Sequence, residues 1–178
     1  MDTKNVLAII GGISKDSLNK SFYNELVKLN ETSLRFTTFD ISLLPFYSQD
    51  IENNPPQVVT DLRQAVEKAD AVMLITPEYN RSYPAVLKNA LDWGSRPYGK
   101  SVWTRKPTAI AGASPGKIGT FGAQQHLRNV CSFLDMKLMH QPELYLDASS
   151  SFVDGKLVDS TVAFLKHYLE MFEKWIND

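Results

Sequence analysis

Short apolar runs alternate with longer amphipathic stretches along the chain. The short runs predict five β-strands, at residues 6–10, 34–39, 71–75, 108–111 and 143–146. The longer stretches predict five helices, at residues 17–29, 56–69, 84–93, 122–134 and 158–176. The first, third and fourth strands are mainly apolar, which is typical of strands covered on both faces. The second and fifth have the mixed composition of edge strands.

The last predicted helix has the clearest periodicity. Its apolar residues follow one another at intervals of three or four positions and form one stripe, which comprises Val158, Val162, Leu165, Leu169, Phe172 and Ile176. We expect this stripe to pack on the sheet, because such spacing marks a core-facing helix more often than a cofactor site. The charged residues Lys166, Glu170 and Lys174 are expected to face outward.

Strands that alternate with helices predict an α/β fold with a parallel sheet. The length of 178 residues fits one domain, residues 1–178, and five strands in this succession fit the flavodoxin-like doubly wound order 2-1-3-4-5. In that order the first, third and fourth strands are neighbours, and ligands bind beyond their carboxyl ends. We therefore expect the functional site in the turns that follow Ile10, Ile75 and Ala111.

The charge balance narrows the class of partner. The chain has 19 basic and 20 acidic residues without long runs of one sign, so we expect no nucleic-acid partner and no membrane partner, but a small molecule or a protein. No apolar span approaches the length that crosses a bilayer. The single cysteine, Cys131, excludes an internal disulfide framework and favours a reducing compartment, for which the cytoplasm is the default.

The first turn, from Gly11 to Asn19, places glycines, hydroxyls and an amide before a helix. Backbone N–H groups at a helix start point at an anion, and Ser14, Ser17 and Asn19 can add donors. The pattern predicts a phosphate site, although it matches neither the Walker pattern nor the GxGxxG pattern. The alternative is an ordinary capped turn.

The other two turns have a different character. Residues 76–84 are rich in aromatic and amide groups, and their proline-stiffened backbone suits the polar edge of a flat heteroaromatic ring, with Tyr79 covering apolar surface. The alternative is that Tyr79 and Tyr83 are rim aromatics and that Glu78 is a solvated charge. Residues 112–122 contain glycines that allow backbone to approach a ligand.

Two stretches make the chain resemble a known family. Residues 77–93 read PEYNRSYPAVLKNALDW, and a second stretch runs from Gly116 through Gly119 to Arg128. Both are similar to signatures of the NADPH-dependent FMN reductase family, which comprises flavodoxin-like quinone, azo-dye and chromate reductases. The resemblance implies FMN as cofactor and NAD(P)H as electron donor, with quinones, azo compounds, chromate or free flavin as small-molecule acceptors. It also implies homodimers or homotetramers with the flavin near a subunit interface.

The resemblance also assigns roles to the turns. The first turn would hold the FMN phosphate, the second would meet the flavin ring, and the third would close the other side. The FMN-binding residues predicted in this way are Gly11, Ser14, Lys15, Ser17, Asn19, Pro77, Glu78, Tyr79, Asn80, Ser82, Ser114, Gly116 and Gly119.

The first turn departs from the family pattern G-S-x-R-x-x-S-x-N. Gly12 stands in place of the serine, and Ser14 stands in place of the arginine. A hydrogen bond to a charged group contributes about 1.5–3 kcal/mol, so this loss predicts FMN binding weaker by about ten- to a hundredfold. Lys15 is the residue that can compensate; without it, FMN would exchange more readily, as a substrate.

Other polar and aromatic residues receive no chemical role. We predict no catalytic side chain, because the flavin carries the chemistry in such a site. His126, His140 and His167 have no metal-ligand spacing, and Cys131 lies among apolar neighbours as a buried, inert thiol.

Two further segments leave questions for the structure. The aromatic and basic segment 93–103 fits a subunit contact, a pocket rim or an exposed loop, and we favour a contact because exposed tryptophan is enriched at interfaces. Residues 44–56 are polar and bounded by prolines, which predicts a surface excursion near the site.

Two alternative functions also fit the sequence. One is a flavodoxin-type electron carrier that reacts with protein partners, although the near-neutral charge of the chain disfavours this function. The other is a flavin-binding regulatory domain without turnover.

Overall fold

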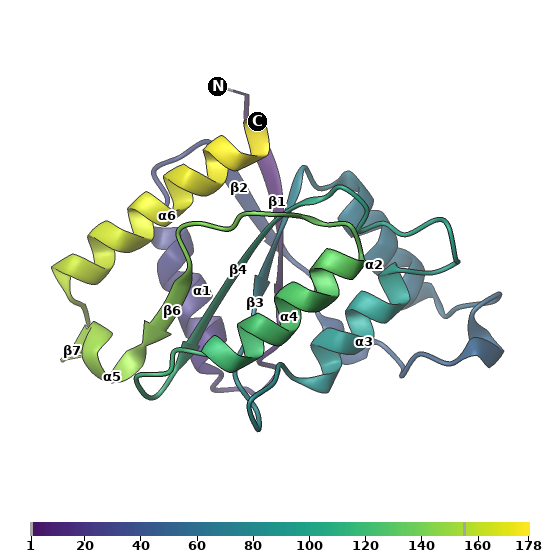
Figure 1. The fold of residues 1–178 in the computed structure, drawn as a ribbon, viewed down its shortest axis with the longest axis horizontal. Helices are drawn as coiled ribbons and strands as arrows, with labels where there is room; N and C mark the ends of the chain where they lie inside the picture. Colours follow the sequence, from purple (N-terminus) through teal and green to yellow (C-terminus); the bar gives the residue numbers. More distant parts are fainter. Residues whose placement is uncertain (1, 155) are drawn as a thin grey trace.

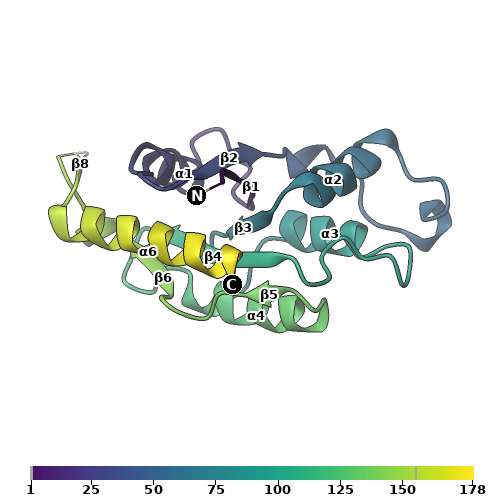
Figure 2. The same cartoon turned by 90° about the horizontal axis from the view of Figure 1, so that it is seen from above.

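A computed structural model describes residues 2–154 and 156–178 and shows a parallel sheet with helices on both faces (Figures 1 and 2). The strands follow the order β2-β1-β3-β4, and both β5 and β6 pair with β4. The bounds are β1 (Lys4–Ile10), β2 (Leu34–Thr38), β3 (Ala71–Ile75), β4 (Pro107–Ser114), β5 (Lys137–Leu138) and β6 (Leu144–Asp147). The predicted flavodoxin-like order is confirmed.

The edge of the sheet beside β4 differs from the prediction in one detail. The predicted strand at residues 143–146 is β6, which pairs with the second half of β4, while the unpredicted β5 pairs with its beginning. Two residues are too few to produce a strand periodicity, so β5 has no signal in the sequence.

All five predicted helices are present: α1 (Leu18–Lys28), α2 (Gln57–Lys68), α3 (Ala85–Gly94), α4 (Phe121–Phe133) and α6 (Asp159–Asn177). Shorter elements were not predicted. They are η1 (Ile41–Leu43), η2 (Gln49–Ile51), α5 (Ala148–Ser151) and the hairpin of β7 (Phe152–Val153) and β8 (Lys156–Leu157).

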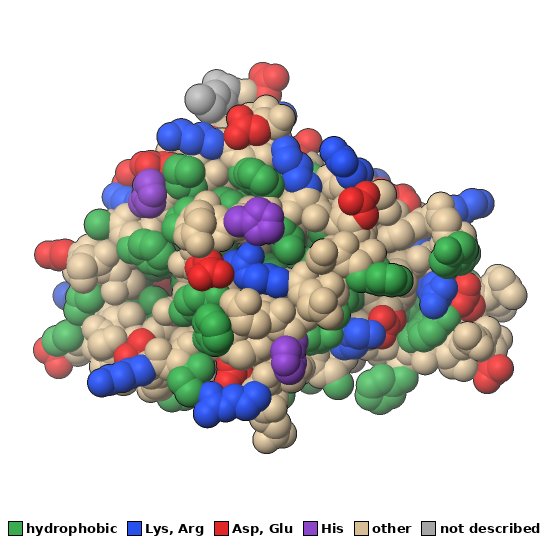
Figure 3. All heavy atoms as spheres, in the orientation of Figure 1, with side chains coloured by type: hydrophobic (Ala, Val, Ile, Leu, Met, Phe, Trp, Pro, Cys, Tyr) green, Lys and Arg blue, Asp and Glu red, His purple; other side chains and the backbone are tan. Residues whose placement is uncertain are grey.

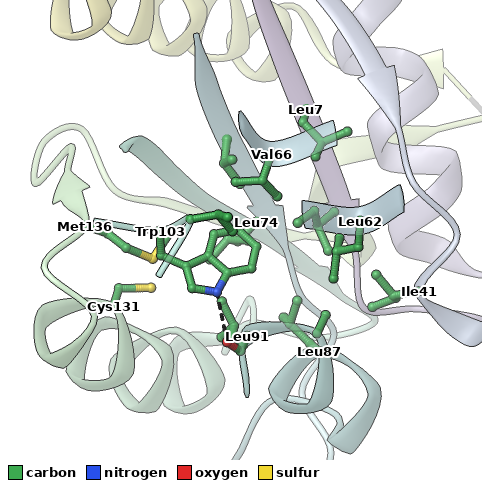
Figure 4. Packing of buried hydrophobic residues seen from close by; sticks show 14 of the residues in the cluster. Leu7, Ile41, Leu62, Val66, Leu74, Leu87, Leu91, Trp103, Cys131 and Met136 are labelled. Atoms are coloured by element: carbon green, nitrogen blue, oxygen red, sulfur yellow. Dashed lines mark hydrogen bonds between the residues drawn. The ribbon is translucent and has the colours of Figure 1, made fainter. Parts of the chain in front are cut away.

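The sheet separates two apolar clusters, because alternate side chains of each strand point to opposite faces. Leu7, Val72 and Leu74 face α2, α3 and α4, and Figure 4 shows part of this cluster. Val6 and Met73 face the opposite layer of α1 and α6, which Figure 2 shows on the other side of the sheet.

Helix α6 packs as its stripe predicts, with Leu165, Leu169 and Phe172 fully buried. The predicted stripe does not include Tyr168. This residue is 1% exposed, and its hydroxyl donates a hydrogen bond to the Ile110 carbonyl at 2.9 Å. Burial of Tyr168 therefore depends on a polar partner in the sheet that helical spacing does not reveal.

The segment 93–103 places both of its tryptophans in the core. Trp103 is 0% exposed, donates its indole N–H to the Leu91 carbonyl at 2.8 Å (Figure 4), and covers Gly94. Trp93 is 1% exposed. The interpretation of these tryptophans as exposed contact residues is therefore wrong, whereas Tyr98 does stand in solvent at 90% exposure.

The excursion at residues 44–56 is fastened to α3. The Asn89 amide donates to the Pro45 carbonyl at 2.9 Å and accepts from the Tyr47 backbone N–H at 2.8 Å, and Trp93 donates to the same carbonyl at 2.8 Å. Two residues of the 77–93 signature, Asn89 and Trp93, thus hold backbone in place.

Candidate FMN site at the carboxyl ends of the strands

The three predicted turns meet at one edge of the sheet, at the bottom of Figure 1. Register places Ile10 beside Ile75, and Ile75 beside Ala111. The ladder continues into the turns, because the Gly11 N–H donates to the Ile75 carbonyl at 2.8 Å and the Thr76 N–H donates to the Ala111 carbonyl at 2.9 Å. The predicted adjacency of the turns is confirmed.

In the first turn, Ser17 caps α1 by accepting a hydrogen bond from the Lys20 N–H at 3.4 Å. A Cβ atom on Gly12 would lie 2.2 Å from the Ser17 hydroxyl oxygen, so glycine is required while Ser17 keeps this position. Ser14 and Lys15 are exposed on the same turn, where a solvent-borne anion can reach them. The absence of the family serine at position 12 thus has a packing reason.

Asn19 connects the first turn to the third. It is 3% exposed, its amide donates to the Ala113 carbonyl at 3.0 Å, and its oxygen accepts from the Ala113 N–H at 2.9 Å. The side chain therefore fixes the start of α1 against the end of β4. Its predicted contact with the phosphate stays a prediction.

The second turn is a tight hairpin. Tyr79 and Ser82 exchange two backbone hydrogen bonds, of 2.8 and 3.0 Å, and Asn80 and Arg81 between them have φ values of 51° and 67°. Positive φ at both central positions is typical of a type I′ turn. The turn leaves Tyr79 53% exposed, and the Ser82 hydroxyl lies 3.1 Å from the Nδ1 atom of His126.

Glu78 joins the second turn to the helix after the third. Its side chain is 11% exposed, its Oε2 atom accepts from the Ala123 N–H at 3.1 Å, and its Oε1 atom lies 3.2 Å from Arg81. Thr120, at the start of α4, provides no side-chain cap, so this carboxylate satisfies an N–H group at the helix end. The alternative of a solvated Glu78 charge is wrong.

The third turn is held by Ser114, whose hydroxyl donates to the Gly116 carbonyl at 2.7 Å and accepts from the Gly119 N–H at 3.0 Å. Gly119 has a φ of +57°, and a Cβ there would lie 2.6 Å from the carbonyl carbon of Tyr145. Gly119 therefore has a structural reason to be glycine. A Cβ on Gly116 would meet nothing within 4 Å, so its backbone is open to a ligand.

A cavity of about 400 Å³, which we call the ring cavity because the flavin ring is predicted there, lies between the second and third turns. Four of the predicted site residues line it, namely Glu78, Asn80, Ser114 and Gly116. The prediction missed the other lining residues, which are Arg81, Lys117, Ile118 and Thr120. Arg81 and Lys117 lie inside the two signature stretches, so proximity to those stretches was the available signal.

The remaining predicted site residues lie elsewhere on the same edge. Pro77 and Tyr79 belong to the second turn, and Gly11 is buried where Pro77 and Pro84 pack over it. A Cβ on Gly11 would lie 2.9 Å from the Pro84 ring. This contact brings the first and second turns together without a gap for a side chain.

Groups for other chemistry are scarce. Among residues 2–154 and 156–178, no three or more His, Cys, Asp or Glu side chains are grouped so as to hold a metal ion. Cys131 is 0% exposed, and burial raises the pKa of its thiol to about 12, which confirms it as a buried thiol that stays protonated at neutral pH. Within the described residues no helix is long and apolar enough to cross a membrane.

Known proteins match almost the whole chain. The sequence profile described as NADPH-dependent FMN reductase matches residues 4–150. The chain belongs to this family. A 2-hydroxy-1,4-benzoquinone reductase of a Burkholderia species is 44% identical over 176 residues, which cover 97% of this chain and 96% of the relative. A quinone reductase of Pseudomonas putida is 43% identical over 175 residues, covering 97% and 94% of the two chains.

A solved structure gives the same result for the fold. The flavoenzyme NAD(P)H:(acceptor) oxidoreductase FerB from Paracoccus denitrificans superposes with a TM-score of 0.90 at 41% identity, and the match covers 98% of each chain. The family membership makes FMN the expected cofactor of the site described above, and the three turns agree with it.

The residues present fit FMN. The cavity volume of about 400 Å³ lies in the range of small-molecule sites, and the open backbone at Gly116 and the exposed Tyr79 offer polar and aromatic contacts for a ring. The exposed hydroxyl of Ser14 and the ammonium of Lys15 stand at the start of α1, where a phosphate is favoured.

Proposed function

We propose that this protein oxidises NAD(P)H and passes the electrons through FMN to a quinone or another small oxidant, such as an azo compound, chromate or free flavin. The observation that carries the proposal is the cavity between the turns after β3 and β4, which opens at the edge where parallel α/β sheets bind ligands. Support comes from relatives at 43–44% identity that are quinone reductases.

The protein contributes binding and orientation. The start of α1, with Ser14, Lys15 and Ser17, would receive the FMN phosphate, and the second and third turns would hold the ring between Asn80 and Gly116. Gly11, whose N–H is bonded to Ile75, would let the first and second turns pack closely together. FMN, when bound, supplies the redox chemistry, which is hydride acceptance followed by electron donation. Glu78 and Asn19 keep the three turns at fixed positions through their bonds to Ala123 and Ala113.

No side chain needs to act as nucleophile or general base in this proposal. The ionisable groups that line the cavity are Glu78, Arg81 and Lys117, and Glu78 is already engaged by a helix end and by Arg81. We therefore propose no catalytic residue, and we assign Glu78 a positioning role. Pro77, Tyr79 and Ser82 complete the proposed ring-side surface, and Gly119 shapes the third turn.

The decisive experiment uses the purified chain, its visible spectrum and two assays. We expect about one FMN bound per chain at saturation, and NAD(P)H oxidation that depends on an added quinone. Failure to bind FMN would contradict the proposal. FMN binding without turnover of NADH or NADPH would favour an electron carrier or a regulatory domain. The mixed charges on the face shown in Figure 3 disfavour the carrier, because a surface that docks protein partners is expected to carry charges of one sign.

We also propose a homodimer or homotetramer. Large apolar side chains stand exposed, with Leu43 at 66% in η1, Phe46 at 77% in the excursion after it, and Tyr79 at 53% in the second turn. Such side chains are favoured at subunit contacts. Light scattering on the eluted protein would give the mass; a monomer at micromolar concentration would contradict this proposal. A cytoplasmic location is proposed from the single, buried cysteine.

A further inference from the structure

A second cavity, of about 310 Å³, adjoins the first turn on the side away from the ring cavity. It lies where β1 and β2 end and where α1 begins. Its walls are Ile10, Ile13, Lys20, Tyr23, Asn24, Thr38, Phe39, Asp40 and Ile41. Ile13 belongs to the first turn itself, so this cavity begins next to the proposed phosphate position. None of these residues lines the ring cavity.

The walls combine flat apolar surface with a fixed carboxylate. Tyr23 and Phe39 are half-buried aromatic residues, and Ile13 is 44% exposed, which together suit a planar heterocycle. Asp40 accepts hydrogen bonds at its Oδ1 atom from the Ser42 N–H at 3.0 Å and from the Ser42 hydroxyl at 2.6 Å. These bonds orient the carboxylate and lower the pKa of Asp40, so it is ionised at neutral pH.

Asp40 has a counterpart in doubly wound sheets of the Rossmann type. In Rossmann folds with a GxGxxG turn, an acidic residue about 20 positions beyond that turn binds ribose hydroxyls. The first turn here lacks the GxGxxG pattern, so the likeness lies in the position of Asp40, directly after β2. In Rossmann folds the dinucleotide lies across the point where the strand order reverses, with its phosphates at the turn after the first strand. In this protein that point lies between β1 and β3, since β2 and β3 flank β1 on opposite sides.

Lys20 supplies a cation between the turn and the cavity. Its Nζ atom donates to the Ile13 carbonyl at 3.2 Å, which holds the ammonium group beside the first turn. A second phosphate that extends from the FMN phosphate toward β2 would meet this charge.

We propose that the cavity beside β2 receives the adenosine of a flavin dinucleotide, so that the site binds FAD as well as FMN. This inference rests on the proposed function, because the flavin phosphate must occupy the first turn. The flavin ring then lies on the β3 and β4 side, and the adenosine lies on the β2 side between the aromatic walls. Asp40 receives the ribose hydroxyls, and Lys20 faces the second phosphate.

The test compares FMN and FAD binding to the flavin-free protein by calorimetry. Asn24 and Val27 are both exposed on α1, but only Asn24 lines the cavity. Asn24→Trp fills the cavity, and Val27→Trp is the matched control. We expect wild type to bind FAD at least as tightly as FMN, and Asn24→Trp to weaken FAD at least tenfold while changing FMN less than twofold. The control should leave both affinities unchanged.

Several outcomes would overturn the inference. One is that wild type binds FAD at least tenfold more weakly than FMN. Another is that Asn24→Trp binds FAD with the same affinity as wild type. If Asn24→Trp raises the KM for NADH but leaves the FAD affinity unchanged, the cavity binds the pyridine nucleotide and not the adenosine of FAD. If neither flavin binds, the proposed function fails as well. If Asn24→Trp lowers the melting temperature more than the control does, Thr38→Phe provides the same block from the end of β2, with the same expected affinities.

Discussion

The carboxylate of Glu78 accepts a hydrogen bond from the backbone N–H of Ala123 at 3.1 Å, although the two residues are 45 positions apart. Glu78 belongs to the turn after β3, and Ala123 is the third residue of α4, which follows β4. One side chain therefore sets the spacing between the two turns that enclose the ring cavity. It also replaces the cap that Thr120 does not provide.

Removal of this carboxylate should cost stability and flavin affinity together. Glu78→Ala is expected to lower the free energy of unfolding by about 1–2 kcal/mol, because a helix end loses its acceptor. Glu78→Gln keeps an acceptor oxygen and should lose less. Urea unfolding and FMN titration of the same samples measure both effects. Glu67→Ala is the control, since Glu67 is 57% exposed and 4.0 Å from Arg63. Unchanged stability and affinity in Glu78→Ala would contradict the positioning role.

The first turn offers a prediction in the opposite direction. Ser14→Arg supplies the guanidinium that the family pattern contains, and Ser14 is exposed at the start of α1. We expect FMN to bind about ten- to a hundredfold more tightly, since a charge-assisted hydrogen bond contributes about 1.5–3 kcal/mol. Calorimetric titration with FMN measures this.

Position 12 gives the complementary variant. Gly12→Ser also restores a family residue, but its Cβ would lie 2.2 Å from the Ser17 hydroxyl oxygen. It should therefore weaken FMN binding rather than strengthen it. Equal gains from Ser14→Arg and Gly12→Ser would show that packing around Ser17 does not govern this turn.

Gly94 should tolerate no side chain. A Cβ there would lie 2.4 Å from the indole ring of Trp103, which is fully buried and bonded to Leu91. Gly94→Ala is expected to destabilise the fold by about 1–3 kcal/mol, the usual cost of overpacking a core. Gly116→Ala is the control for stability, because a Cβ there meets nothing within 4 Å. Thermal unfolding of both variants tests the prediction, and equal melting temperatures would refute it.

Burial of Cys131 predicts a pH dependence. Burial raises the pKa of its thiol from 9.0 to about 12, so the unfolded chain loses this proton at lower pH than the folded chain does. Stability from this group is therefore complete below about pH 9 and is lost as pH rises toward 12. Cys131→Ala should show a shallower fall in unfolding free energy between pH 8.5 and 10, before the tyrosines contribute fully. Parallel pH slopes in the two proteins would contradict this account.

The same burial predicts slow chemistry at the thiol. A disulfide reagent at pH 8 should modify Cys131 only in denaturant, because the reactive thiolate is absent from the native core. Rapid labelling of the native protein, at the rate of a small free thiol, is the result that this structure does not allow.

The sequence by itself determined the longer helices and strands, their order and the edge of the sheet where the candidate site lies. Apolar runs and amphipathic periods report which faces are buried, and this was enough to place β1, β3 and β4 side by side. It was also enough to single out the three turns after them, four of whose residues line the ring cavity. Short elements such as β5 escaped, because two residues contain no period.

Only the tertiary structure decided what the polar side chains bind. Glu78, Asn19 and Asn89 each bond to backbone in a different part of the chain, at Ala123, Ala113 and Pro45. Trp103 was expected at a surface but lies in the core. The physical reason is that a hydrogen bond requires one partner at one distance and angle. Periodicity fixes the direction in which a side chain points, whereas the partner depends on how distant segments pack.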